Sequence, residues 1–134
     1  MVFSYLFDAP IMPDMLAEEF GHYNTESGSY HSLFPDSGEK YGIYVEETYN
    51  WEAVVEALKN GQVVIANPTE DIFTSGGHFI VLYGITEEGR ILVHDPNEYN
   101  YLSSNSKLRD GFENGFWQSD IKYTCMPCYI YPLK

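Results

Sequence analysis

Residues 74–97 constrain the fold more than any other stretch of this chain. They read TSGGHFIVLYGITEEGRILVHDPN, so two apolar runs, residues 79–85 and 90–94, flank a polar turn that ends in Gly89. Two runs rich in β-branched and apolar residues, separated by a short turn that contains glycine, are typical of an antiparallel β-hairpin. The sequence therefore predicts two paired strands over residues 79–85 and 90–94.

Helical patterns precede this hairpin, and further strands surround it. We predict helices over residues 1–7, 12–24, 29–41 and 50–61, the third interrupted near Pro35 and the fourth ended by Gly61. Short strands are predicted over residues 44–47, 62–67 and 128–133, a short helix over residues 113–121, and a polar surface loop over residues 97–108. Helices that come first and an antiparallel sheet that follows indicate an α+β fold. The length of 134 residues suits a single domain, residues 1–134.

The register of the hairpin decides which side chains share a face of the sheet. With a four-residue turn, Ile85 pairs with Arg90 and Leu82 pairs with Val93. Because side chains alternate along a strand, residues 78, 80, 82, 91, 93 and 95 then lie on one face. A charged or titratable residue within this set would therefore point to the same side as the apolar ones.

His78 and Asp95 belong to that set and carry the candidate chemistry. The register makes them diagonal neighbours, with backbone positions roughly 7–8 Å apart, whereas His94 falls on the opposite face. An acid that binds one imidazole nitrogen fixes the tautomer and leaves the other nitrogen as a general base. Gly76 and Gly77 allow the close backbone approach that a substrate passing the histidine requires. A His–Asp pair on a sheet is also often a purely structural pair, and the residue types leave both alternatives open.

The charge balance excludes two classes of partner. Seven Lys and Arg residues stand against 20 Asp and Glu residues, which gives a formal net charge of −13. Nucleic acids and anionic lipid surfaces both require a basic footprint, so neither is an expected partner. No apolar run approaches the roughly 18 residues of a membrane span, so we expect no membrane insertion. The start of the chain lacks a signal-peptide pattern, while 12 Tyr residues favour an extracellular or cell-envelope setting, and the compartment stays open.

The two cysteines, Cys125 and Cys128, form one Cys-x-x-Cys pattern near the end of the chain. A thioredoxin-like pair requires a helix that starts at the first cysteine, whereas a strand is predicted here. A zinc site requires four ligands, and no second cysteine pair or histidine pair is spaced to complete one. We therefore expect ordinary buried or disulfide-linked cysteines, with no metal and no cofactor.

Several segments, taken in order, resemble a known family. These are VFSYL, PDMLAEEF, KYGIYVEE and WEAVVEALKNGQVVIA, followed by the hairpin with its Gly-Gly-His and Asp-Pro-Asn ends. Their order resembles the bacteriocin-processing-peptidase-like domains (peptidase family C-thirty-nine-like) of the papain-like cysteine peptidase superfamily. The resemblance implies an α+β papain-like core with a helical half packed on an antiparallel sheet. It also implies that His78 is the catalytic base and Asp95 its orienter, with Gly76, Gly77 and Asn97 supporting the site.

The resemblance places the nucleophile outside this sequence. In the family, a cysteine opens the first long helix within a Cys-Gly-Pro-Thr-Ser-like motif, and a Gln precedes it. A helix N-terminus and a nearby imidazolium both stabilise the reactive thiolate. The family's next segment aligns with residues 1–6, so that cysteine is expected roughly two helical turns before Met1. We therefore expect an N-terminally truncated peptidase domain that keeps a base and an orienter, contains no nucleophile and is inert as this fragment.

Three hypotheses follow from the sequence. The first is a thiol-dependent peptidase that hydrolyses a peptide or protein substrate. The second is a non-catalytic module that keeps the peptidase fold and binds peptides or other partners without turnover. The third is self-association through an apolar patch on the first helix, formed by Val2, Phe3 and Leu6.

Overall fold

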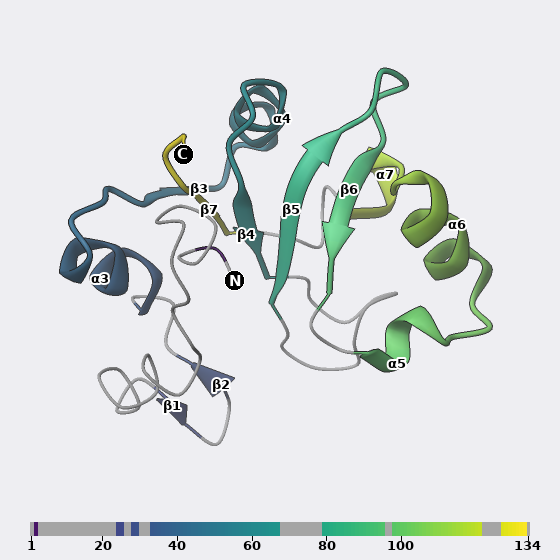
Figure 1. Ribbon diagram of the computed structural model, residues 1–134, viewed down its shortest axis with the longest axis horizontal. Coiled ribbons are helices and arrows are strands. Elements are labelled where there is room, and N and C mark those ends of the chain that lie inside the picture. Colours follow the sequence, from purple (N-terminus) through teal and green to yellow (C-terminus); the bar gives the residue numbers. More distant parts are fainter. Residues whose placement is uncertain are drawn as a thin grey trace.

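The computed structural model describes residues 2, 24–25, 28–29, 33–67, 79–95, 98–121 and 127–133. At its centre lies a five-stranded antiparallel sheet with the strand order β3-β7-β4-β5-β6 (Figure 1). Its strands are β3 (Glu46–Thr48), β7 (Cys128–Ile130), β4 (Val64–Ala66), β5 (Ile80–Ile85) and β6 (Ile91–His94). A separate two-stranded pair consists of β1 (Asn24–Thr25) and β2 (Gly28–Ser29). Helices around an antiparallel sheet confirm the predicted α+β class.

Helices flank both edges of the sheet. Helix α3 (Leu33–Lys40) lies beside the β3 edge, while α5 (Glu98–Tyr101), α6 (Ser106–Asn114) and α7 (Gln118–Ile121) lie beside the β6 edge (Figure 1). No helix in the part of the chain that the structure describes is long and apolar enough to cross a membrane.

Helix α4 (Trp51–Lys59) covers one face of the sheet and confirms the helix predicted over residues 50–61. Asn50 caps its N-terminus, because the Asn50 side chain accepts a hydrogen bond of 3.0 Å from the backbone N–H of Glu52. Gly61 follows the helix with φ +85°, a conformation that favours glycine and ends the helix. The buried side of α4 presents Trp51 and Leu58, among others, to the sheet.

The two faces of the sheet belong to two apolar clusters. The larger cluster lies between α4, the sheet and the α6–α7 segment, and contains Val64, Ile80, Leu82, Ile91 and Val93, among others. The smaller cluster lies on the opposite face and contains Val2, Val45, Val63, Tyr129 and Tyr131, with Phe34 of α3 packed against it. Successive strand residues alternate between the clusters, as the pleat of a sheet requires.

Val2 is the one described residue of the predicted first helix, and it is helical as expected. Its side chain is only 7% exposed, because it packs in the smaller cluster. It therefore does not belong to an exposed apolar patch, which corrects that part of the self-association hypothesis. Phe3 and Leu6 lie outside the described residues, as does the helix predicted over residues 12–24 except for Asn24, which is in β1.

The short helix predicted within residues 29–41 is α3, which begins at Leu33. The predicted interruption near Pro35 is wrong, because the helix continues through Pro35. Pro35 lies in the first turn, where a backbone N–H has no intrahelical acceptor, so the missing donor costs nothing. Residues 28–29 form β2 instead.

The segment after β6 differs most from its prediction. Residues 97–108, predicted to be a polar loop, contain α5 and the first turn of α6, and the helix predicted over residues 113–121 is divided between α6 and α7. Asn105 caps α6 by accepting hydrogen bonds from the backbone N–H groups of Lys107 and Leu108. Only Leu108 and Gly111 of α6 are buried, so the helix has too few apolar residues for a clear helical period. Gly115, with φ +93°, ends it.

Candidate active site

The β5–β6 hairpin has the predicted register near the candidate site and a different register near its loop. Leu82 pairs with Val93, as predicted, and Val81 pairs with His94. Towards the loop, Ile85 pairs with Ile91 rather than with Arg90. The reason is a β-bulge between Leu82 and Gly84, which adds one residue to β5 and lengthens the loop to residues 86–90.

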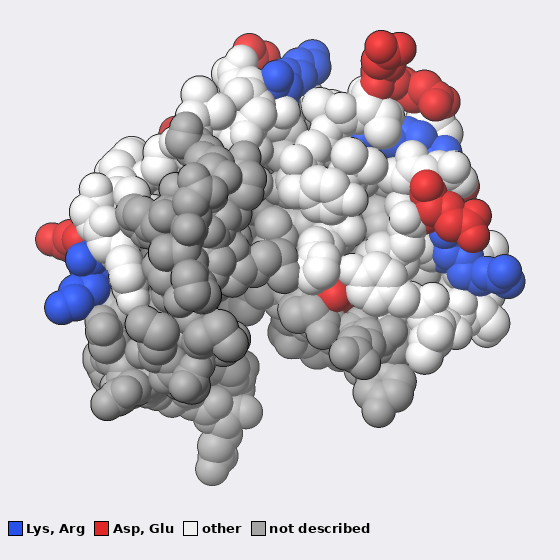
Figure 2. Space-filling view, viewed as in Figure 1, with Lys and Arg blue, Asp and Glu red and all other residues white. Residues whose placement is uncertain are grey.

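The loop itself is closed by short-range hydrogen bonds. The Thr86 N–H donates to the Arg90 carbonyl at 2.8 Å, and the Gly89 N–H donates to the Thr86 carbonyl at 2.9 Å. Figure 2 shows acidic side chains at the tip of this loop, where Glu87 and Glu88 are exposed. On the face that this view shows, few charged side chains lie between that tip and the lower edge of the described part.

Burial alternates along β6 and continues past its end. Ile91, Val93 and Asp95 are buried, while Leu92 is half-buried and His94 is exposed. This alternation agrees with the predicted assignment of Asp95 and His94 to opposite sides. Residues 76–78 and Asn97 lie outside the described residues, so the pairing of His78 with Asp95, and the roles of Gly76, Gly77 and Asn97, remain predictions.

Asp95 is the most deeply buried acidic residue in the described part of the chain, with 1% exposure. Two residues of α5 contact it. The Asn100 amide donates a hydrogen bond to the Oδ2 atom of Asp95 at 2.5 Å, and the backbone N–H of Asp95 donates to the hydroxyl of Tyr101 at 2.9 Å. Both partners are uncharged, so these two contacts satisfy polar atoms of Asp95 without adding an opposite charge.

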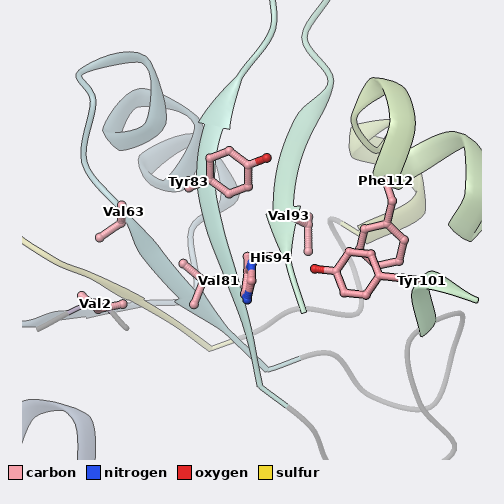
Figure 3. A pocket seen from close by; sticks show the side chains of 8 residues that line it. All are labelled: Val2, Val63, Val81, Tyr83, Val93, His94, Tyr101 and Phe112. Atoms are coloured by element: carbon pink, nitrogen blue, oxygen red, sulfur yellow. The ribbon is translucent and has the colours of Figure 1, made fainter. Parts of the chain in front are cut away.

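Tyr101 connects Asp95 to the core. Figure 3 shows its ring beside that of Phe112 of α6. The two rings are stacked with centroids 4.1 Å apart, and Phe112 meets Phe116 edge-on at 5.2 Å. Phe116 is only 1% exposed and exchanges two backbone hydrogen bonds of 2.7 Å with Ile91. Aromatic pairs of this geometry contribute beyond the area they bury. The backbone of Asp95 is therefore tied through three rings to the other end of β6.

A cavity of about 530 Å³ lies beside this aromatic group. Its lining is mostly apolar, and His94 and Tyr101, whose ring centroids are 6.4 Å apart, are among its polar side chains (Figure 3). The lining residues are Val2, Val63, Val81, Tyr83, Val93, His94, Tyr101 and Phe112. The cavity thus reaches from the smaller apolar cluster to α5 and α6.

A second buried charge, Arg90, lies at the start of β6. Its guanidinium donates through Nε to the Gly115 carbonyl at 2.8 Å, pairs through Nη2 with Asp110, and lies 4.3 Å from the centre of the Trp117 ring. The pKa of Asp110 is lowered, first by the hydrogen bond from Asn114 and then by that from Arg90. Gly115 has to be a glycine here, because a Cβ would lie 2.9 Å from the Cβ of Arg90.

Cys128 lies within the larger apolar cluster and is fully buried, which fits the expectation of an ordinary buried cysteine. A reactive cysteine is partly exposed, whereas Cys128 is fully buried. Cys125 lies outside the described residues. Among the residues that the structure describes, no cluster of three or more His, Cys, Asp or Glu side chains is placed to hold a metal ion.

Asn100 and Tyr101 were missed by sequence reasoning. The polar composition of residues 97–108 predicted a loop, and a short helix of four residues has no periodicity to detect. The available signal was the presence of two hydrogen-bonding side chains shortly after the candidate acid.

A sequence model of the Peptidase_C39 like family matches residues 1–125 of the chain. No curated protein matches the chain.

Proposed function

Since this chain belongs to the Peptidase_C39 like family, we propose that it contributes the base and the orienting acid of a cysteine peptidase active site. The family supports a peptidase-like fold of the papain-like class, and the observed α+β architecture agrees with it. The proposal takes residues 1–134 as one domain and a peptide or protein as the substrate.

The single observation that carries this proposal is the burial of Asp95 at the end of β6. A buried carboxylate is costly unless hydrogen bonds compensate it, and the hydrogen bonds described for Asp95 come from neutral groups. An acid held in this way can orient a neighbouring imidazole and stabilise its protonated form. The predicted hairpin register brings His78 next to it, and the observed pairing of Leu82 with Val93 supports that register.

In the proposed reaction, a thiolate attacks the carbonyl carbon of the peptide bond. His78, protonated at that stage, gives its proton to the leaving amine, and an acyl-thioester remains. His78 then takes a proton from the water that attacks the thioester, the carbon–sulfur bond breaks, and the acid product leaves behind the thiolate and the protonated His78. Gly76, Gly77 and Asn97 are proposed to support the site next to His78 by allowing the substrate backbone to approach.

The proposed nucleophile is the cysteine of the family's Cys-Gly-Pro-Thr-Ser-like motif rather than a cysteine of this sequence. Cys128 is unsuited because it is fully buried in the larger apolar cluster. The test follows directly: residues 1–134 are joined behind a segment that carries the motif and its upstream Gln, and hydrolysis of a fluorogenic peptide library is measured.

The fused protein should hydrolyse peptides and be inactivated by a thiol-directed inhibitor. His78→Ala should abolish turnover, while His94→Ala, the matched histidine on the other side of β6, should keep kcat whatever its effect on KM. Equal loss of kcat in both variants, or hydrolysis that resists the inhibitor, would remove the proposal.

A second candidate function is peptide binding without turnover, and the cavity favours it. A mostly apolar cavity of about 530 Å³ is large enough for one or two side chains of a peptide. Under this alternative, residues 1–134 bind library peptides in a calorimetric titration, and the fused protein binds the same peptides without cleaving them. Self-association of the chain is a separate outcome, detected as a concentration-dependent mass in analytical ultracentrifugation.

A further inference from the structure

The short helix α5 holds Asp95 at two points. We propose that Asn100 and Tyr101 are positioning residues, which fix the carboxylate and the backbone of Asp95 so that Asp95 can orient His78. This inference rests on the proposed function, in which Asp95 is the acid that orients the base. Both are proposed to act through Asp95.

The first contact fixes the carboxylate. The Asn100 amide donates to Oδ2, one of the two carboxylate oxygens, and so fixes the orientation of the carboxylate that is proposed to orient His78. A neutral donor suits this role better than Lys or Arg would, because it holds the carboxylate in place and leaves its negative charge to act on the histidine. With 1% of Asp95 exposed, water is nearly absent, and the amide replaces a hydrogen bond that water would otherwise make.

The second contact fixes the backbone. The hydroxyl of Tyr101 accepts the N–H of Asp95 at 2.9 Å, one residue beyond the last paired residue of β6. Among the pairings described for β5 and β6, Val81 with His94 stands next to Asp95, so the Tyr101 hydroxyl holds the main chain one residue past the strand. Tyr101 is itself held by the stacked ring of Phe112, and through it by Phe116.

The two contacts come from consecutive residues. Asn100 and Tyr101 follow Asp95 by five and six positions and end the four-residue helix α5. Two residues close to the candidate acid in sequence therefore bind it: the Asn100 amide binds the Asp95 carboxylate, and the Tyr101 hydroxyl binds the Asp95 backbone N–H. Because α5 also packs against α6, the position of Asp95 is coupled to a helix that belongs to the core.

The test measures the tautomer of His78 directly in the protein as it is. Ring-nitrogen chemical shifts are recorded on a nitrogen-15-labelled sample at a pH where histidine is neutral, and His78→Gln assigns the signals. An orienting carboxylate selects one tautomer, which gives two well-separated ring-nitrogen shifts. Asn100→Leu, which removes the donor at similar size, should move these two shifts towards each other as both tautomers become populated.

Further variants keep the test decisive if Asn100→Leu does not fold. Tyr101→Phe removes only the hydroxyl and keeps the ring stacked on Phe112, and it should change the His78 shifts in the same direction. Asn100→Gln keeps an amide donor and should restore part of the single-tautomer signature. Asn114→Leu is the matched control, because Asn114 makes the same kind of amide-to-carboxylate bond to Asp110, at 3.0 Å, on the exposed side of α6.

Each outcome has a defined meaning. If Asp95→Asn changes the tautomer of His78 and the Asn100 and Tyr101 variants do not, the positioning role is wrong and the proposed function stands. If Asp95→Asn leaves the tautomer unchanged, the pairing of His78 with Asp95 is wrong, and the proposed function and this inference both fail. If Asn114→Leu changes it as much as Asn100→Leu does, the effect is a general loss of structure and the positioning role is also wrong.

Discussion

Strand β6 is flanked by two buried charged residues, and the groups that contact them differ. Arg90 precedes the strand and is 8% exposed, while Asp95 follows it and is 1% exposed. Arg90 is paired with a carboxylate, bound to a backbone carbonyl and covered by an indole ring. The contacts to Asp95 from α5 are an amide and a hydroxyl, neither of which carries a charge.

Under the proposed function, this difference separates a charge that supports structure from one that orients a histidine. The positive charge of Arg90 is compensated locally, so its removal should affect the fold and little else. The negative charge of Asp95 is held in place without compensation from α5, which is the arrangement that a histidine-orienting acid requires. Helix α6 serves both ends, because Asp110 binds Arg90 and Phe112 supports Tyr101.

The largest expected loss of stability comes from a change in α6, the helix that contacts residues at both ends of β6. A Cβ at Gly111 would collide with the buried ring of Phe116, so Gly111→Ala must shift α6 and disturb both ends together. We expect a loss of about 3 kcal/mol in the free energy of unfolding, measured by urea denaturation. Glu113→Ala, on the exposed side of the same helix, should change it little. If Gly111→Ala reduced the unfolding free energy less than Glu113→Ala does, α6 would not be packed as described.

Removal of the Arg90 charge, which is compensated by its neighbours, should have the next largest effect on the unfolding free energy. Arg90→Met deletes the bonds to Gly115 and Asp110 and leaves the Gly115 carbonyl without this donor, for an expected loss of about 2 kcal/mol in unfolding free energy. The tautomer of His78 should not change. Lys107→Met is the control, because its pair with Asp120 at 3.4 Å involves a lysine side chain that is 60% exposed and should contribute about 0–1 kcal/mol.

Neutralising Asp95 should reduce the unfolding free energy less than Arg90→Met does, and should reduce turnover more. In Asp95→Asn, the new side-chain oxygen still accepts the bond from Asn100, so the unfolding free energy should change by no more than about 1 kcal/mol. Turnover of the fused peptidase should nevertheless fall by about 10⁴-fold if Asp95 orients the base. A loss of stability as large as that of Arg90→Met, with turnover retained, would make Asp95 a structural charge and break the comparison.

The smallest expected effect concerns the acid dependence of stability. The pKa of Asp110 is lowered from its ordinary 3.8 by Asn114 and Arg90, so the folded protein holds this proton less tightly than the unfolded chain does. Its stabilising contribution is therefore complete above pH 3.8 and is lost as the pH falls below that value towards the lower folded pKa. The difference in unfolding free energy between the unaltered protein and Asp110→Asn should shrink over this interval. A difference that does not change with pH would contradict the assignment.

The sequence predicted the elements with strong periodicity and failed where the determinants are not periodic. Helix α4 and the β5–β6 hairpin could be predicted because a cap, a glycine stop and regular apolar spacing all agree. The break into α5, α6 and α7 could not be predicted, since few residues of α6 are buried and its position depends on contacts with Phe116 and Arg90. Such contacts join residues distant in sequence, and periodicity carries no information about them.

The same limit applies to the candidate site. Asp95 could be placed from strand alternation alone, because its burial follows the period of two. The contacts of Asn100 and Tyr101 with Asp95 could not be predicted in this way, because the position of Tyr101 depends on its packing against Phe112. The pairing of His78 with Asp95 was predicted from the hairpin register and their catalytic roles from the resemblance to the family, and both stay predictions.

The β-bulge in β5 makes the end of the hairpin at Asp95 tolerant of changes in loop length. On the Asp95 side of the bulge, Leu82 pairs with Val93, and on the loop side Ile85 pairs with Ile91, one step out of phase. Deleting Tyr83, which the ladder skips, would give a regular hairpin in which Leu82 still pairs with Val93. The register beside Asp95 is therefore independent of the register beside the loop, so that a loop of another length can be accommodated with Asp95 kept in place.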